Sequence, residues 1–264
     1  MRIVRDLGLA FQFLTRLPIP GNHHEKTSIS QAAVYFPLVG LVVGAGAAAL
    51  HRILGGRVNA SVMAVVVLVY LVLITGGLHE DGLADVADGF GGGWTKERIL
   101  EIMRDSRVGA FGALAIALSA LARYSLLSSL ADDARVVSPA GFSILGSHTP
   151  SRFAAYVIAA HVLCRWTTLP LAYFLPAART SGQGASVARQ ISSTSVLLGT
   201  ILAVAICYFF LRSALLVPLA VTLAVTLLSG LYYRRRIGGV TGDCFGATNQ
   251  VAEIAVYFCG AIGP

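Results

Sequence analysis

Charge is scarce in this chain: only 12% of its 264 residues are Asp, Glu, Lys or Arg. A typical soluble domain has about 25% charged residues. Hydrophobic residues make up 56% of the chain, and the mean hydropathy is +0.74. One soluble core of this size cannot hide so much apolar surface from water. The composition argues against a soluble enzyme, a disordered protein and a fibrous repeat, and it predicts a membrane protein with several spans.

Two other common signals are missing. The 4 cysteines form no Cys-x-x-Cys pair, so no disulfide framework is predicted and the thiols are expected to be small buried apolar groups. The segment 1–20 carries Asp6 and Arg16 and has no small-residue cleavage site, which argues against a signal peptide. It is predicted to form an amphipathic helix at the membrane interface, ended by Pro18 and Pro20.

Apolar stretches long enough to cross a membrane recur along the chain. About 20 apolar residues span the hydrocarbon core of a bilayer. The candidates are residues 31–51, 60–78, 109–130, 153–174, 195–211, 214–233 and 249–263. They predict an all-α polytopic bundle of about seven spans, within a range of six to eight, formed by a single domain over residues 1–264. The segment 139–147 is a candidate re-entrant or interfacial piece.

Basic residues indicate how these spans are oriented. Positive side chains of connecting segments stay on the cytoplasmic side. Most of them lie in the N-terminal segment or in the segments 79–108, 176–193 and 234–248, which are predicted to share one face. A cytoplasmic N-terminus is therefore predicted, with these three segments in the cytoplasm. The formal net charge of +7 is explained by these loops rather than by nucleic acid, which is not an expected partner.

Acidic residues are gathered in one segment, and more than half of the 13 lie between positions 80 and 105. They are Glu80, Asp81, Asp85, Asp88, Glu97, Glu101 and Asp105. If the helix of the second span continues past Gly77, three aspartates (Asp81, Asp85 and Asp88) stand at i, i+4 and i+7 on one stripe. Such carboxylates repel one another unless a cation joins them, and hard oxygen ligands favour Mg²⁺ or Mn²⁺.

A solvated charged helix end is the alternative interpretation of this stripe. Two observations favour the metal. No Lys or Arg is interleaved between positions 79 and 95, and several glycines allow a ligand to approach the backbone closely. His79, beside the stripe, is a candidate proton acceptor.

Arginines near the acidic segment are candidate phosphate ligands. Thr95 is predicted to cap a short helix that ends at Arg104-Asp105-Ser106-Arg107. Two arginines and a serine at a helix end suit a phosphate, while positive flanking of a span explains the arginines equally well.

Polar residues in later spans add further candidates. Arg123 and Arg165 lie within predicted spans, where an ionisable residue points to a functional site unless it reaches the interface by snorkelling. Asp243 follows a glycine-rich turn on the same face as the aspartate stripe and is a candidate fourth metal ligand, the alternative being a polar turn. Asn249 and Glu253 stand at the edge of the last span.

Several motifs together resemble one enzyme family. GGLHEDGLADVADG (76–89) and RILEIMRDSRVGAFG (98–112) resemble the hallmark of the cobalamin synthases, the adenosylcobinamide-GDP ribazoletransferases. Further segments look like the same family: FLTRLPIP (13–20), YFPLVG (35–40), RWTTLPLAYFLPAAR (165–179) and TGDCFGATNQVAE (241–253). The likeness runs in order along nearly the whole chain.

The resemblance implies a Mg²⁺-dependent transferase of the prokaryotic inner membrane, with its active site facing the cytoplasm. Its substrates would be adenosylcobinamide-GDP and α-ribazole, or α-ribazole 5′-phosphate. The ribazole hydroxyl would attack the phosphate attached to the cobinamide side chain, and GMP would leave. Membrane lipid is the other expected partner, and the sequence leaves the oligomeric state open.

Residue roles follow from the matched motifs and from the needs of phosphoryl transfer, which are charge neutralisation and positioning. The expected metal ligands are Asp81, Asp85, Asp88 and Asp243. The expected catalytic residues are His79, Asp81, Asp85, Asp88 and Asp105. The expected substrate-binding residues are Arg104, Ser106, Arg107, Arg165, Arg179, Asn249 and Glu253.

Two other functions compete with this hypothesis. The run DVADG (85–89) also resembles the signature of CDP-alcohol phosphotransferases, but the Ala-Arg pair and the closing aspartates of that signature are missing. A cation-coupled transporter would place its acidic residues near the bilayer midplane between broken helices. Here they cluster at one junction between a loop and a span.

Overall fold

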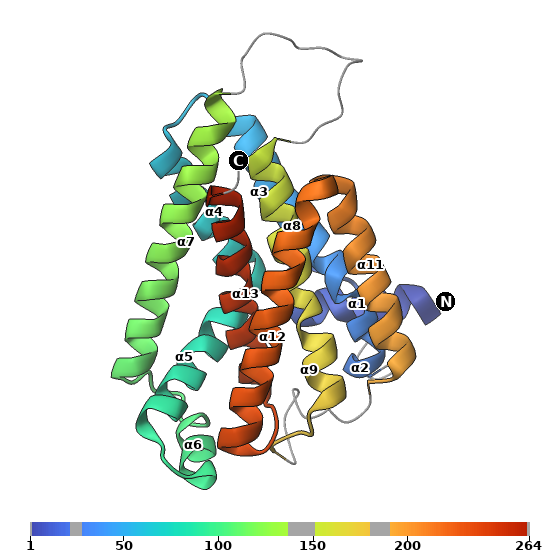
Figure 1. Cartoon of the computed structure of the whole chain (residues 1–264), viewed down its shortest axis with the longest axis vertical. Helices are drawn as coiled ribbons and strands as arrows, with labels where there is room; N and C mark the ends of the chain where they lie inside the picture. The colour runs from blue at the N-terminus through green and yellow to red at the C-terminus, as the bar shows by residue number, and fades with distance from the viewer. Residues whose placement is uncertain (1, 22–27, 137–150, 180–190, 263–264) are drawn as a thin grey trace.

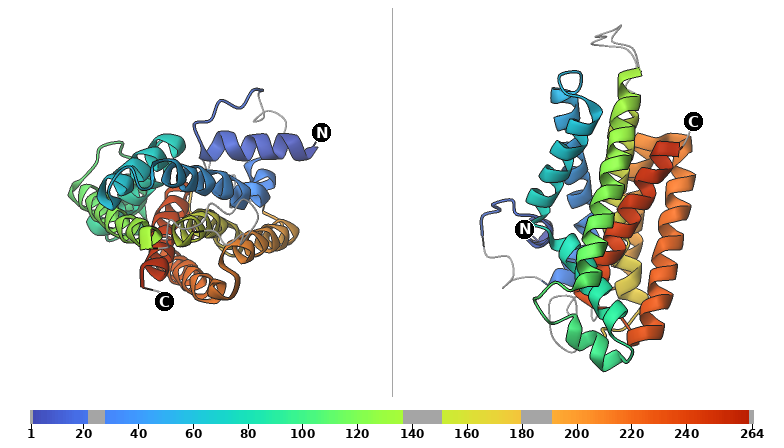
Figure 2. Two further views of the ribbon diagram at one scale, coloured as in Figure 1. Left: turned by 90° about the horizontal axis from the view of Figure 1, so that it is seen from above. Right: turned by 90° about the vertical axis from the view of Figure 1, so that its left-hand side faces the viewer.

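The structure is a computed structural model that describes residues 2–21, 28–136, 151–179 and 191–262. Its long helices run along a common axis, and Figures 1 and 2 show the N-terminal helix lying across that axis. In order, the elements are α1 (Arg2–Leu14), α2 (Ile29–Ala32), η1 (Ala33–Tyr35), α3 (Phe36–Leu54), α4 (Ala60–Thr75), α5 (Leu78–Gly92), α6 (Lys96–Ile102), α7 (Ala110–Val136), α8 (Arg152–Trp166), α9 (Thr168–Phe174), α11 (Ser193–Leu211), η2 (Arg212–Leu215), α12 (Leu216–Ile237) and α13 (Gly242–Ile262). In the described ranges, β-structure is limited to isolated bridges.

Several helices begin where the sequence provides a side-chain cap. Asn59 accepts a hydrogen bond from the Val62 amide at the start of α4, at 2.8 Å. Ser151 and Ser192 cap α8 and α11 in the same way. The cap predicted at Thr95 is confirmed, because its hydroxyl accepts from the third amide of α6. These bonds satisfy backbone N–H groups that have no partner within the helix.

Four described stretches are long and apolar enough to cross a membrane: Ile29–Leu54, Ala110–Asp133, Arg152–Phe174 and Ser193–Ile237. The last contains α11 and α12, which run in opposite directions from the turn at η2 (Figure 1). Large apolar side chains on the outer helices are exposed, as expected of surfaces that face lipid; examples are Leu121, Phe209 and Leu228. The all-α polytopic membrane fold is confirmed, whereas the number of about seven spans stays a prediction.

The centre of the bundle is built on close helix contacts. In the apolar part of the stretch that contains α8 and α9, 83% of the residues are buried, in contrast to 22% in that of α11 and α12. α3 crosses α8 at Gly40 and Gly44, where a Cβ on Gly44 would stand only 2.7 Å from the Cα of Ile158. Small residues four positions apart let helix backbones approach in this way.

The helix of the second predicted span breaks earlier than expected. Gly76 and Gly77 both take the left-handed conformation, with φ of 66° and 71°, which glycine adopts without a steric cost. α4 therefore ends at Thr75, and α5 leaves it at an angle of 87°. The condition stated for the aspartate stripe, that one helix continues past Gly77, is not met. The three aspartates of the predicted stripe nevertheless lie together on α5 and keep their spacing.

The described parts of the segments expected on one face lie toward the same end of the bundle. α6, the end of α9 and the turn between α12 and α13 are neighbours at the lower end of Figure 1. α13 begins at Gly242, seven residues before the predicted span at 249, so Asp243 belongs to its first turn. The candidate segment 139–147 lies outside the described residues.

Candidate active site

The aspartate stripe of α5 faces the first turn of α13. The two helices approach each other through Gly82 and Gly246, since a Cβ on Gly82 would stand 2.9 Å from the carbonyl oxygen of Asp243. No larger residue would fit between the two backbones without moving one of them. This crossing brings Asp243 beside α5, more than 150 positions away in the sequence.

Arg179 reaches the same place through a short backbone bridge. The Ala178 amide donates to the Val240 carbonyl at 2.8 Å, and the Val240 amide donates to the Pro176 carbonyl at 2.9 Å. This bridge holds the segment after α9 against the turn before α13. The Arg179 guanidinium then donates to Asp243 Oδ2 at 3.2 Å and to the Leu100 carbonyl at 3.3 Å.

Negative charge is concentrated at this crossing. Burial, with the nearby Asp81 carboxylate, raises the pKa of Asp243 above its usual range, although Arg179 opposes the shift. The Asp85 carboxylate is repelled by Asp243, Asp81 and Asp88 and attracted by Arg179. In the described part of the chain, the oxygens of these carboxylates do not converge within 4.8 Å as a set of three. The residues thus form a loose acidic cluster in which a bound cation would relieve the repulsion.

Asp88 is already engaged by the backbone. Its Oδ2 accepts a hydrogen bond from the Gly109 amide at 2.7 Å, and its Oδ1 accepts one from the Gly112 amide at 2.8 Å. Both amides belong to the start of α7, where a carboxylate also complements the helix dipole. A Cβ at either glycine would overlap with the carboxylate in its present position, so a larger residue there would displace the Asp88 side chain from these bonds. Of the predicted metal ligands, Asp88 has the least free coordinating capacity.

The predicted phosphate loop after α6 is on the surface. Arg104, Ser106 and Arg107 are exposed. Arg107 forms a bidentate ion pair with Asp105, with Nη2 at 2.5 Å from Oδ2 and Nε at 2.9 Å from Oδ1. These hydrogen bonds lower the pKa of Asp105 to about 2. In this arrangement the Asp105 carboxylate is paired with its own neighbour rather than with the acidic cluster.

Arg123 is the centre of a buried ionic network that joins α5, α7 and α13. Its Nη1 lies 2.6 Å from Glu80 and its Nε 3.1 Å from Glu253. Nη1 also donates to Gln250 Oε1 at 2.9 Å, and Ser119 donates to the same oxygen at 2.9 Å. The guanidinium is only 3% exposed, so the two carboxylates neutralise a charge that solvent does not reach. Glu253, predicted to bind substrate, is thus placed in this network.

Three more predicted site residues lie in the interior. Arg165 is 2% exposed and donates through Nη1 to the carbonyl of His161 at 3.1 Å. Asn249 is 3% exposed and donates to the Phe245 carbonyl at 2.9 Å. His79 is 7% exposed, and its backbone lies against Gly246 where α5 crosses α13. The predicted site residues therefore separate into an accessible cluster around α5 and a buried set beneath it.

One described set of three groups has the spacing of a metal site, namely His161, Cys164 and Glu253. Arg165 Nη1 lies 3.1 Å from His161 Nδ1 and 3.6 Å from Cys164 Sγ. A cation among these atoms would be repelled by the guanidinium already there. We interpret the set as the surroundings of Arg165.

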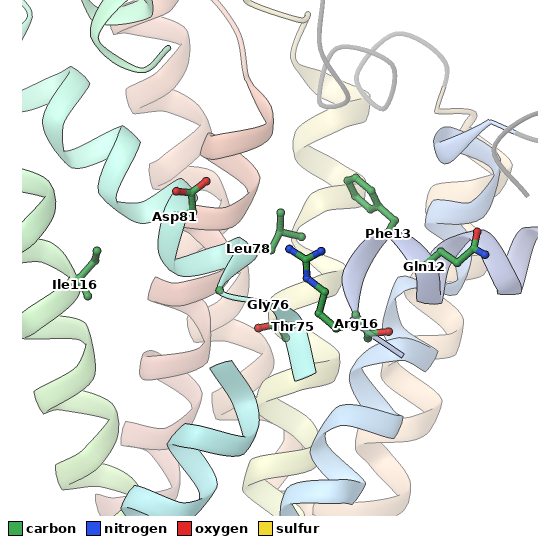
Figure 3. Close-up of a pocket in the computed structure, with 10 residues that line it drawn as sticks. Gln12, Phe13, Arg16, Thr75, Gly76, Leu78, Asp81 and Ile116 are labelled. Carbon is green, nitrogen blue, oxygen red and sulfur yellow. The ribbon is translucent and has the colours of Figure 1, made fainter. Parts of the chain in front are cut away.

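Two cavities flank α5. The first, of about 640 Å³, is lined by Asp81, by the break at Gly76 and Gly77, and by Arg16 at the end of α1 (Figure 3). The second, of about 580 Å³, lies between Asp88, the end of α6 and the start of α7. Sequence reasoning missed Arg16 as a site residue. The signal was present in the motif FLTRLPIP, which contains it.

Comparison with known proteins decides the family. The family model described as cobalamin-5-phosphate synthase matches residues 6–261. The chain belongs to the cobalamin-5-phosphate synthase family. Proteins named adenosylcobinamide-GDP ribazoletransferase are similar over almost their whole length. The relative from Polaromonas sp. strain JS666 is 39% identical, with 97% of this chain and 96% of the relative covered. The relative from Shewanella amazonensis is 40% identical, with 94% and 92% covered.

A third relative of the same name, from Ralstonia pickettii strain 12J, is 38% identical over 95% of this chain and 92% of its own length. No solved structure matches the chain significantly. Membership of the cobalamin-5-phosphate synthase family makes this membrane protein a transferase of cobalamin biosynthesis. The resemblance stated from the motifs is confirmed.

Proposed function

We propose that the protein joins adenosylcobinamide-GDP to α-ribazole, or to its 5′-phosphate, and releases GMP. The observation that carries this proposal is the meeting of Asp81 and Asp85 with Asp243 beside a cavity of about 640 Å³. These carboxylates come from two distant segments that both match the motifs of the family. The names of the relatives supply the substrates.

The acidic cluster suits Mg²⁺, and Mn²⁺ is the alternative. Mg²⁺ in phosphoryl-transfer sites is held by one or two carboxylates, several waters and the phosphates of the substrate. A loose cluster fits this habit better than it fits a closed cage of protein ligands. Asp81, Asp85 and Asp243 would hold the ion, while Asp88 supports the site by capping α7. When bound, the ion would neutralise and orient the diphosphate.

The reaction forms one bond and breaks one. The oxygen of the ribazole hydroxyl bonds to the phosphorus on the cobinamide side, and the bond from that phosphorus to the GMP oxygen breaks. The hydroxyl proton needs an acceptor within reach of the cavity. We assign this role to a carboxylate of the cluster, because Asp81 is exposed to the cavity whereas the side chain of His79 is buried.

The site is proposed to face the cytoplasm of a prokaryotic inner membrane, with the N-terminus on the same side. Support comes from the basic segments, which gather at the end of the bundle that holds α6 (Figure 1). Labelling of single cysteines introduced at exposed positions, such as Glu97 in α6 and Arg57 before α4, tests this orientation. Reagents that cannot cross the membrane should reach Arg57→Cys, but not Glu97→Cys, from outside intact cells.

The reaction is tested with the purified protein in lipid, supplied with adenosylcobinamide-GDP, α-ribazole and Mg²⁺. We expect GMP release that EDTA abolishes and added Mg²⁺ restores. The double variant Asp81→Asn with Asp85→Asn should lose activity. Asp132→Asn, at an exposed position far along α7, is the matched control and should keep it. Absence of GMP release, or normal activity of the double variant, contradicts the proposal.

A further inference from the structure

The cavity beside Asp81 is lined by one basic side chain, that of Arg16, which has no role in the site as described so far. Its wall is formed by the end of α1, the break between α4 and α5, and Ile116 of α7, as Figure 3 shows. A volume of about 640 Å³ is in the range of small-molecule sites. Arg16 is the basic residue of this wall and Asp81 is the acidic one.

Arg16 is held in place by its backbone rather than by its charge. Its amide donates to the Ile74 carbonyl at 2.7 Å, which ties the end of α1 to the end of α4. Its side chain lies across Gly76, where a Cβ would overlap with Nε. No ion pair or side-chain hydrogen bond joins the guanidinium to another described residue. The positive charge of Arg16 is therefore held at the cavity, where a ligand can pair with it.

The hydrogen-bond donors of the uncharged polar side chains in the wall already have backbone acceptors. Gln12 donates to the carbonyls of Ile19 and Gly21, at 2.9 and 2.8 Å. Thr15 and Thr75 each donate to the carbonyl four residues earlier in their chain. On the far side of the acidic cluster, Arg179 is paired with Asp243. Among the described residues that line this cavity, Arg16 is thus the cation that a ligand can use.

We propose that Arg16 binds the diphosphate of the nucleotide-linked substrate. A guanidinium can bond to two phosphate oxygens at once. It would also neutralise the negative charge of the diphosphate, which the Asp81 carboxylate repels. The inference rests on the proposed function, since it places the diphosphate between Arg16 and the carboxylates. It assigns Arg16 to the donor substrate, because adenosylcobinamide-GDP carries a diphosphate, whereas neither α-ribazole nor its 5′-phosphate does.

Binding and kinetics together test this role. GDP with Mg²⁺ is the binding probe, measured by titration calorimetry on the protein in nanodiscs. We expect Arg16→Gln to weaken GDP binding about 10- to 100-fold, the range for a lost hydrogen bond to a charged group, and Arg16→Lys to fall between. In the GMP-release assay, Arg16→Gln should raise KM for adenosylcobinamide-GDP by a similar factor and leave KM for α-ribazole within about twofold.

Arg57→Gln is the matched control. Arg57 is exposed before the start of α4, whereas Arg16 lies beside its end, about 24 Å away for a helix of 16 residues. This variant should bind GDP as the unaltered protein does. Equal thermal unfolding of the Arg16 and Arg57 variants verifies that the fold is kept.

The outcomes separate three cases. Unchanged GDP affinity in Arg16→Gln overturns the inference, even when the unaltered protein releases GMP. If Arg16→Gln keeps its GDP affinity and loses activity only through an altered dependence on anionic lipid, Arg16 binds lipid headgroups. That result also overturns the inference. If the unaltered protein binds GDP through Arg16 but releases no GMP, the proposed reaction fails while the diphosphate site stands.

Discussion

Asp81 and Asp88 share a helix, a residue type and a predicted role, yet the structure gives them different environments. Asp88 is 9% exposed and accepts two backbone hydrogen bonds from the start of α7. Asp81 is exposed at the cavity, and its side chain makes no hydrogen bond within the described part of the chain. Replacing each in turn therefore separates the stability of the fold from the chemistry of the site.

Asp88→Ala should destabilise the protein by about 3 kcal/mol. A hydrogen bond to a charged group contributes about 1.5 kcal/mol at the lower end of its range, and two are lost. The amide of Gly112 is also left without a partner in a buried position. Asp88→Asn keeps one acceptor oxygen and should lose about half as much. Asp81→Ala should stay within about 0.5 kcal/mol of the unaltered protein, as is usual for exposed positions.

Chemical and thermal unfolding of the protein in detergent measures these differences. In the GMP-release assay the order should be reversed, with Asp81→Ala nearly inactive. The fraction of Asp88→Ala that remains folded should need the same Mg²⁺ concentration for half-maximal activity as the unaltered protein. A variant of Asp88 that is as stable as the unaltered protein but requires far more Mg²⁺ would refute the capping role and make Asp88 a metal ligand.

Two further outcomes follow from the packing. Arg123→Met leaves the half-buried Glu80 and the buried Glu253 without the cation that pairs with both, and it should cost about 3–5 kcal/mol in unfolding experiments. Adding Glu253→Gln should recover part of that loss, and strictly additive effects would argue against a shared network. Gly82→Leu should push α5 away from α13 and abolish GMP release, while the helical circular dichroism signal is retained. Gly92→Ala is the control and should be active, because its Cβ would meet only Ile102, at 3.4 Å. Full activity of Gly82→Leu would show that the close crossing is not needed.

Local patterns in the sequence predict much of this molecule. Long apolar runs require helices that face lipid, because backbone groups in a bilayer must bond within the segment. The cap at Thr95 and the spacing of Asp81 and Asp85 depend only on neighbouring residues, so both are read correctly. The break at Gly76 was missed. A glycine pair within an apolar run is compatible with a straight helix, and contacts such as that between Arg16 and Ile74 favour the bend.

The membrane bundle and the acidic stripe can be predicted from the sequence, since composition and helical period are local properties. Which charges meet depends on the tertiary structure. Asp243 joins the stripe because Gly82 and Gly246 let two backbones cross closely, and Arg179 follows because a bridge at Val240 holds its segment there. Asp88 caps α7, and Arg123 and Arg165 are buried by the helices packed around them. Each of these outcomes depends on contacts between residues far apart in the chain, which no local pattern encodes.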